Sequence, residues 1–227
     1  MKMKVFLFGI SGRMGQELKA QIDASSDLVC IGGFSRKDKN PQLADSPDII
    51  IDFSLPEAFE DLCAFNKKYP SAALVSGTTG LSDEQKLKLK EMGKRAPVFW
   101  AANMSFGVYL MSKLTEYLAN YSQQYNLHVE ETHHVHKKDK PSGTAIIIEN
   151  AAKKKTNHLG PTISHREGEV FGIHRFIAAN EFETLEIRHE ANSRGLFAKG
   201  ALDIARWLAE NPPGFYAMDD YFENFSS

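Results

Sequence analysis

The chain has 227 residues, 42% of them hydrophobic and 25% charged, which is ordinary for a soluble globular protein with one large or two small domains. A net charge of −2 argues against nucleic acid or an anionic membrane as its main partner. No apolar stretch approaches the ~20 residues that span a bilayer, the apolar start is too short for a signal peptide, and the two cysteines are isolated. We therefore expect a cytoplasmic protein.

The first part of the chain alternates short apolar runs with helical patterns. The run KVFLFG at 4–9 is typical of a buried parallel strand, and it leads into glycines at 9, 12 and 15 followed by the helical spacing of Met14, Leu18 and Ile22. Glycines here permit a tight turn and a close backbone approach, and the start of the helix can receive a pyrophosphate. The pattern predicts a dinucleotide-binding turn.

Further strands are expected at 28–34, 48–53, 72–76 and 98–101, with helices between them. The strings SLPE at 54–57 and SDEQ at 82–85 predict capping boxes that start two of these helices. GTTG at 77–80 follows a strand at its carboxyl end, where open α/β sheets bind ligands. Alternating strands and helices predict right-handed crossovers and a Rossmann-like parallel sheet over residues 1–104.

The end of the second strand bears on the choice of cofactor. A site that selects NAD offers a carboxylate to the ribose hydroxyls at this point, but here Ser35 is followed by Arg36 and Lys37. Two cations could pair with a 2′-phosphate, so we favour NADPH over NADH. The alternative is that both cations are only solvated.

The pattern changes after residue 104. Apolar spacing from Val108 to Tyr121 predicts a long amphipathic helix, and 127–131, 173–178 and 184–189 are expected as strands, the last two antiparallel. This arrangement indicates an α+β second domain with an open mixed sheet, and self-association is a natural way to cover its free face. From Phe197 a helical pattern returns and ends before the two prolines at 212–213.

The sequence EETHHVHKKDKPSGTA at 130–145 concentrates the chemistry of the second domain. Ser142 is a plausible N-cap for the apolar helix that follows, and a helix start suits a carboxylate or phosphate. With imidazoles and ammoniums beside it, the stretch reads as a pocket for a small dianion with a proton donor at hand. A solvated loop is the alternative. We expect no metal site, because Lys137 and Lys138 would repel a cation among these histidines.

Several separated strings together resemble the dihydrodipicolinate reductase family. They are GISGRMG at 9–15, IDFS at 51–54, GTTG at 77–80, AANMSFGV at 101–108, EETHHVHKKDKPSGTA at 130–145, REGEVFGIH at 166–174 and SRGLFAKGA at 193–201. The resemblance implies a homotetrameric oxidoreductase of lysine and diaminopimelate biosynthesis that reduces 4-hydroxy-tetrahydrodipicolinate, a small dicarboxylate, with NADPH or NADH. It also implies a dinucleotide-binding domain at 1–104 and 194–227 and a substrate-binding and oligomerisation domain at 105–193.

The resemblance also assigns residues. The family's catalytic histidine falls on His133 and its proton-donating lysine on Lys137. Substrate contacts are implied for His134, Lys137, Ser142, Gly143 and Thr144. Cofactor contacts are implied for Gly9, Ile10, Ser11, Gly12, Arg13, Met14, Gly77, Thr78, Thr79, Ala101, Ala102, Asn103 and Met104, with Ser35 and Arg36 standing where many members have an acid. The chain looks trimmed at 37–46, after the second strand.

Two other functions fit part of the sequence. One is a different Rossmann-fold NADP oxidoreductase of an amino-acid pathway. The other is a non-catalytic nucleotide-sensing module whose second domain only oligomerises. Neither needs the string HHVHKKDKPSGTA at 133–145.

Overall fold

The computed structural model of the chain describes residues 2–35, 37–38 and 43–225. The chain folds into two compact units. One, which we name the nucleotide-fold unit, comprises Met1–Met104 and Phe197–Ser227. The other, the central unit, comprises Ser105–Leu196. Each unit has its own sheet and its own core.

The nucleotide-fold unit is built on a six-stranded sheet in the order β10-β5-β4-β3-β1-β2, in which all neighbours are parallel. The expected parallel sheet is confirmed, and its central strands β3 and β4 are buried along their whole length, as their apolar runs indicate. The strands are β1 (Met3–Phe8), β2 (Leu28–Phe34), β3 (Ile49–Asp52), β4 (Ala73–Ser76), β5 (Pro97–Trp100) and β10 (Gly214–Tyr216). The strand β10, which is only three residues long, was not predicted.

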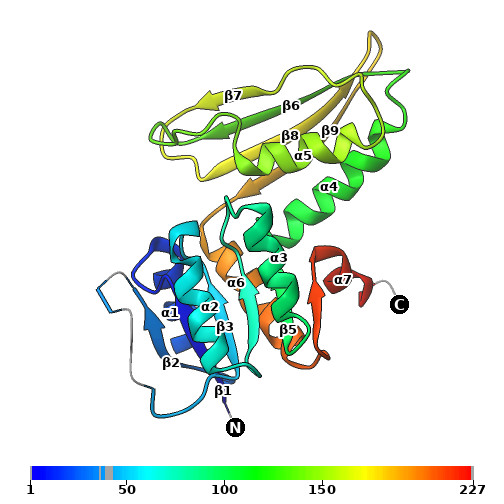
Figure 1. Ribbon diagram of the computed structural model, residues 1–227. Coiled ribbons are helices and arrows are strands. Elements are labelled where there is room, and N and C mark those ends of the chain that lie inside the picture. Colours follow the sequence, from blue (N-terminus) through cyan, green and yellow to red (C-terminus); the bar gives the residue numbers. More distant parts are fainter. Residues whose placement is uncertain (1, 36, 39–42, 226–227) are drawn as a thin grey trace. The chain divides into compact units, whose positions relative to one another are not determined.

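Helices cover both faces of this sheet (Figure 1). The helices α1 (Arg13–Asp23) and α6 (Gly195–Ala209) pack in one core with side chains of β1, β3 and β4. The helices α2 (Phe59–Lys68) and α3 (Asp83–Met92) pack in a second core on the opposite face. A short helix α7 (Met218–Glu223) follows β10. The chain therefore forms a three-layer α/β/α unit, as expected for a Rossmann-like fold.

One of the two predicted capping boxes is confirmed and the other is wrong. Ser82 Oγ accepts from the backbone N–H of Gln85, and the Gln85 side chain accepts from the backbone N–H of Ser82. By contrast, α2 starts only at Phe59, after a single 3₁₀ turn η1 (Pro56–Ala58) without a side-chain cap. The hydroxyl of Ser54 donates to the carboxylate of Asp52 on the preceding strand.

The central unit has a mixed sheet in the order β7-β6-β8-β9, with β6 and β7 parallel and the other pairs antiparallel. The helices α4 (Phe106–Ala119) and α5 (Gly143–Lys153) share a core with one face of it (Figure 1). The α+β expectation is confirmed, although α4 ends before Tyr121 and β7 was not predicted. The strands are β6 (Asn126–His133), β7 (Ile163–Arg166), β8 (Gly172–Ala179) and β9 (Thr184–Ala191).

Successive side chains of β6 point to opposite faces of the sheet, so that one set is buried and the other is partly exposed. Leu127 and Val129 face the helices and belong to the core, and Glu131 and His133 continue along this buried face. Glu130 lies on the opposite face, where it pairs with Arg175 of β8. The strand thus begins in the apolar core and ends in a buried polar cluster at its carboxyl end.

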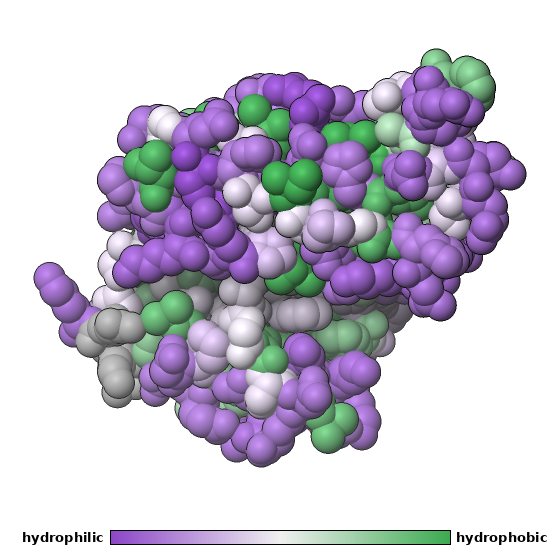
Figure 2. Space-filling view, turned by 90° about the horizontal axis from the view of Figure 1, so that it is seen from above, coloured by the Kyte–Doolittle hydropathy of each residue, from purple (hydrophilic) through white to green (hydrophobic). Residues whose placement is uncertain are grey.

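Hydrophilic residues make up most of one face of the molecule (Figure 2). On the face shown in Figure 2, hydrophobic residues occur in small groups between charged and polar ones. Within the described part of the chain, no helix is long and apolar enough to cross a membrane.

Candidate active site

The glycine turn between β1 and α1 depends on having no side chains. Gly9 has φ +82°, and a Cβ there would lie 2.6 Å from the carbonyl oxygen of Phe53. A Cβ on Gly15 would lie 2.2 Å from the carbonyl oxygen of Gly9. Gly12 is the N-cap of α1, so the first backbone N–H groups of the helix follow the turn directly. The turn can therefore present a helix start to an anion.

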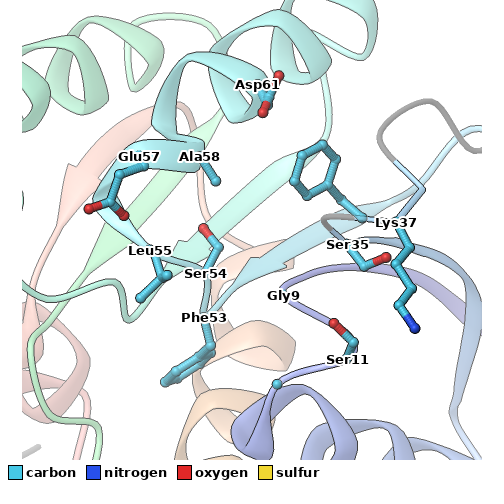
Figure 3. Close-up of a pocket in the computed structure, with 12 residues that line it drawn as sticks. Gly9, Ser11, Ser35, Lys37, Phe53, Ser54, Leu55, Glu57, Ala58 and Asp61 are labelled. Carbon is cyan, nitrogen blue, oxygen red and sulfur yellow. The ribbon is translucent and has the colours of Figure 1, made fainter.

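A cavity of about 840 Å³ opens beside this turn. Figure 3 shows Gly9, Ser11, Ser35 and Lys37 on one side of it and the segment after β3 on the other. Its lining residues are Gly9, Ser11, Gly12, Phe34, Ser35, Lys37, Phe53, Ser54, Leu55, Glu57, Ala58 and Asp61. Four predicted cofactor residues (Gly9, Ser11, Gly12 and Ser35) line it, and Ile10, Arg13 and Met14 lie in the same turn and the start of α1. Arg36 is outside the described residues.

The other predicted cofactor segments follow neighbouring strands of the same sheet. Gly77, Thr78 and Thr79 come directly after β4, and the segment from Ala101 to Met104 comes directly after β5. Because neighbouring strands are parallel, these segments lie at one edge of the sheet. The side chains of Thr78, Ala101 and Met104 are buried, so these residues could offer mainly backbone groups to a ligand. Ala102 and Asn103 stand between two buried residues.

A buried carboxyl group that was not among the predicted site residues connects the loops after β3 and β4. Asp52 is 1% exposed, and its Oδ2 accepts from Ser76 Oγ and Thr78 Oγ1, both at 2.8 Å. Its Oδ1 accepts from the hydroxyl of Ser54 at 2.5 Å and from the Ser54 backbone N–H at 3.0 Å. The signal was the acid in IDFS, placed at the end of a fully apolar strand, which needs partners when buried.

In the central unit, the end of β6 carries a buried acid–imidazole pair. His133 is 6% exposed, and its Nδ1 hydrogen-bonds to Oε2 of Glu131 two residues earlier on the same strand face. Arg166 of β7 donates from its guanidinium to Glu131 Oε1 at 2.9 Å. Neither Glu131 nor Arg166 was predicted as a site residue. The i, i+2 spacing of Glu131 and His133 on a strand was the available signal.

Burial and charge decide the protonation of this pair. Burial would raise the pKa of Glu131, but hydrogen bonds from Ser164, Arg166 and His133 outweigh it and lower the pKa. Burial, aided by the positive charges of Lys137 and Arg166, lowers the pKa of His133 despite the opposing effect of Glu131. An ionised carboxylate can only accept, so Nδ1 of the neutral imidazole carries the proton. Nε2 of His133 is then a hydrogen-bond acceptor and proton acceptor, not a donor, near neutral pH.

The lysine of this cluster, Lys137, lies in the loop between β6 and α5. Its Nζ is 2.9 Å from Asp139 Oδ2, and its side chain is about a quarter exposed. The pKa of Asp139 is lowered, because the hydrogen bond from Lys137 and nearby positive charges outweigh the effect of burial. Lys137 is therefore a cation paired with Asp139 and held close to solvent.

The start of α5 lies at the end of the same loop. Ser142 is the N-cap, and its Oγ accepts from the backbone N–H of Ala145 at 3.2 Å. The same Oγ lies 3.0 Å from His174 Nε2, so the predicted substrate-contact hydroxyl of Ser142 is buried and already engaged. Gly143 and Thr144 open the helix, and a Cβ on Gly143 would meet no atom within 4 Å. The helix start thus faces open space beside Gly143.

His134, the remaining predicted substrate contact, directly follows β6. Its backbone N–H donates to the carbonyl oxygen of Val170 at 2.7 Å. Its Nδ1 is buried without a hydrogen-bond partner among the described residues. The described residues contain no group of three or more His, Cys, Asp or Glu side chains placed to hold a metal ion.

The buried imidazole of His174 predicts a pH dependence of stability. Burial lowers its pKa to about 3, against 6.5 for an ordinary histidine. Between these values the unfolded chain binds the proton and the folded chain does not, so the free energy of unfolding falls as pH drops below 6.5, by up to about 1.4 kcal/mol per pH unit for one proton. His174→Gln should flatten this slope in urea unfolding measured from pH 7.5 to 4.5. The same change at the exposed His158 should leave it unaltered, and equal slopes in all three proteins would contradict the prediction.

Comparisons with known proteins bear on both units. Residues 3–104 match the family described as dihydrodipicolinate reductase, N-terminus, and residues 107–222 match dihydrodipicolinate reductase, C-terminus. The chain belongs to the dihydrodipicolinate reductase family. Within it, the chain is 38% identical to a 4-hydroxy-tetrahydrodipicolinate reductase of Bdellovibrio bacteriovorus, with 96% of each chain covered. It is 35% identical to one of Alkaliphilus oremlandii, with 96% of this chain and 98% of the relative covered.

Solved structures confirm the family fold. A dipicolinate-bound dihydrodipicolinate reductase from Paenisporosarcina sp. TG-14 superimposes with a TM-score of 0.78 at 22% identity over 99% of both chains. An amine dehydrogenase from Mycobacterium smegmatis reaches a TM-score of 0.61 at 11% identity over 95% of both chains. Because dehydrogenases of other substrates share this architecture, the fold alone does not select the substrate.

Proposed function

We propose that this chain is a 4-hydroxy-tetrahydrodipicolinate reductase of lysine and diaminopimelate biosynthesis. In this reaction a cyclic imine with two carboxylates loses its hydroxyl as water and takes up a hydride and a proton, while NAD(P)H becomes NAD(P)⁺. The observation that carries the proposal is the near full-length identity to reductases of this name, together with the clustering of His133, Lys137 and the start of α5 in one unit.

We assign substrate binding to the loop of the central unit and the start of α5. The substrate is a dianion, so it needs cations and N–H donors. Lys137 supplies a cation, and Gly143 and Thr144 supply the backbone of a helix start, whose partial positive charge favours a carboxylate. His134 contributes an imidazole next to the loop. The hydroxyl of Ser142 is already hydrogen-bonded to Ala145 and His174, so Ser142 contributes by holding the start of α5 in place and does not contact the substrate itself.

Proton transfer falls to Lys137 and His133. Lys137 is a cation near solvent and can donate a proton to the carbanionic centre that hydride addition creates. His133 has a lowered pKa and a proton fixed on Nδ1, so it can orient the substrate or accept a proton through Nε2. The hydride comes from the reduced nicotinamide.

We assign the cofactor to the nucleotide-fold unit. The turn from Gly9 to Met14 would hold the pyrophosphate at the start of α1, and the adjoining cavity has room for part of the dinucleotide. The segments after β4 and β5 would approach the nicotinamide half with their backbones. Lys37 lines the cavity beside Ser35 where NAD-selective sites place an acid, which favours NADPH over NADH.

Cofactor preference gives a direct test of Arg36 and Lys37. Replacing either with alanine should raise the KM for NADPH several-fold to tenfold and leave the KM for NADH within about twofold, because an ion pair to a 2′-phosphate exists only in NADPH. Steady-state rates with both cofactors measure the difference. Lys67→Ala, at an exposed site on α2, is the matched control. Equal losses for both cofactors would remove these cations from 2′-phosphate recognition.

We also propose that the protein works as a cytoplasmic homotetramer. The face of the central sheet that carries Glu130, Arg175 and Glu186 lies opposite α4 and α5 and could be covered by another copy. Sedimentation at several protein concentrations would test this assembly, and a monomer throughout would contradict it.

A substrate panel tests the proposed activity against another Rossmann-fold oxidoreductase. Freshly prepared 4-hydroxy-tetrahydrodipicolinate should drive oxidation of NADPH or NADH, whereas aldehydes should not, and amino acids should not drive reduction of NADP⁺ or NAD⁺. Turnover of an amino acid or aldehyde without turnover of the cyclic imine would favour the alternative enzyme. Cofactor binding without turnover of any substrate would favour a nucleotide-sensing module.

A further inference from the structure

Two buried charged residues of the central unit, Glu131 and Arg166, contact the proposed catalytic residues but have no proposed role in the reaction themselves. Glu131 has a side chain with no exposed surface, and the side chain of Arg166 is 9% exposed. They pair at 2.9 Å, and each makes further contacts to the segment that runs from His133 to Asp139. We propose that Glu131 and Arg166 are positioning residues, which together fix the imidazole of His133 and the loop that presents Lys137. This inference rests on the proposed reductase function.

Glu131 sets the orientation of the imidazole. Its Oε2 receives the Nδ1–H of His133, so only Nε2 is left to act outward. Gly172 lies beside the other edge of the ring, and a Cβ built there would lie 2.8 Å from His133 Nε2, so the ring has room in this orientation only because residue 172 has no side chain. His174 stands beside it with ring centroids 5.0 Å apart. The carboxylate therefore selects both the tautomer and the direction of His133.

Arg166 sets the path of the loop. Its Nε donates to the carbonyl oxygen of Lys137 at 3.2 Å, and its Nη2 donates to the carbonyl oxygen of Asp139 at 2.5 Å. Its Nη1 donates to Glu131 Oε1 at 2.9 Å. One planar guanidinium thus ties the strand that ends in His133 to the backbone on both sides of residue 138. Lysine has a single point of charge and cannot reproduce this three-way geometry.

A second acid–arginine pair on the same sheet shows what is special about the first. Glu130 and Arg175 pair at 3.0 Å on the opposite face, with side chains 21% and 41% exposed, and they also contact His128 and Glu186 respectively. A buried pair costs desolvation that its attraction barely offsets, so burial of Glu131 and Arg166 is poorly explained by stability. The contacts to His133 and to the Lys137 loop supply the reason for placing charges there.

The test compares conservative variants of Glu131 and Arg166 with those of a partly exposed ion pair away from the proposed assembly face, Glu116 of α4 and Lys154 after α5. Glu131→Gln and Arg166→Lys should lower kcat about tenfold to a hundredfold, the effect of displacing a reacting group by about an ångström, and should weaken binding of pyridine-2,6-dicarboxylate. Their affinity for NADPH should stay within about twofold. Glu116→Gln and Lys154→Arg should change none of these values more than about twofold. Thermal unfolding of all four variants would show that the losses do not follow the folded fraction.

An activity-independent readout completes the test. In ¹⁵N-histidine NMR of the wild-type protein, His133, assigned through His133→Asn, should show a protonated Nδ1 and an unprotonated Nε2. Glu131→Gln should produce a mixture of tautomers. A protonated Nε2 in the wild type, or equal kcat values for the two sets of variants, would overturn the positioning role. A wild-type protein that shows the expected tautomer but does not turn over the cyclic imine would instead overturn the proposed function.

Discussion

Replacing Lys137 with alanine is expected to lower kcat by about 10²- to 10⁴-fold, the range that a positioned general acid contributes. The affinity for NADPH should stay within about twofold, because Lys137 belongs to the central unit and the glycine turn to the nucleotide-fold unit. Steady-state rates and a fluorescence titration of NADPH measure the two effects. A large fall in kcat with an unchanged affinity for NADPH is what we expect of a residue that acts on the substrate and does not bind the cofactor.

Two companion variants separate proton donation from charge. Lys137→Arg keeps a cation but holds its proton too tightly to donate it well, so its kcat should remain low while pyridine-2,6-dicarboxylate still binds. Lys138→Ala, at the exposed neighbouring position, should behave like the wild type. An unchanged kcat in Lys137→Ala would exclude Lys137 from the mechanism.

Replacing Gly15 with alanine should have the second large effect, at the cofactor turn. The new Cβ would lie 2.2 Å from the carbonyl oxygen of Gly9 and 2.6 Å from the Cα of Ile10, and both are backbone atoms that cannot turn aside. The turn and the start of α1 must therefore separate, and we expect the Kd for NADPH to rise at least about tenfold, together with a lower Tm.

A graded comparison distinguishes the steric cause from a general loss of folding. A Cβ on Gly12 would meet only the carbonyl oxygen of Gly9, at 3.1 Å, so Gly12→Ala should weaken NADPH binding less than Gly15→Ala. Binding of pyridine-2,6-dicarboxylate, which we assign to the central unit, should persist in both variants. Wild-type NADPH affinity in Gly15→Ala would contradict the role of the turn.

The fold was largely predictable because its signals are local. Buried parallel strands appear in the sequence as continuous apolar runs, such as III at 49–51. Ser82 and Gln85, three residues apart, form the capping-box pattern that predicts the start of α3. The strand β7 has no such signal, because its residues are exposed or half-buried and alternate weakly. The capping box predicted at Ser54 was wrong because the chain first makes a 3₁₀ turn over Pro56–Ala58, so α2 begins only at Phe59 and Ser54 is too far away to cap it.

The sequence predicted the residues of the site only where they lie close together in the chain. His133, Lys137 and Ser142 stand within ten positions, so one string brings them together. Arg166 is 35 positions from Glu131, and their pairing depends on the parallel alignment of β6 and β7. The lowered pKa of His133 likewise comes from burial, which the sequence does not display. Contacts that depend on how two strands align, such as that between Glu131 and Arg166, could therefore be identified only from the structure.

A crystal of the protein soaked with pyridine-2,6-dicarboxylate tests the proposed substrate site most directly. This planar diacid resembles the cyclic substrate, so we expect one carboxylate at the backbone N–H groups of Gly143 and Thr144 and the ligand within ion-pair distance of Lys137. A ligand bound elsewhere on the chain, away from both Lys137 and Thr144, would contradict the assignment of the site.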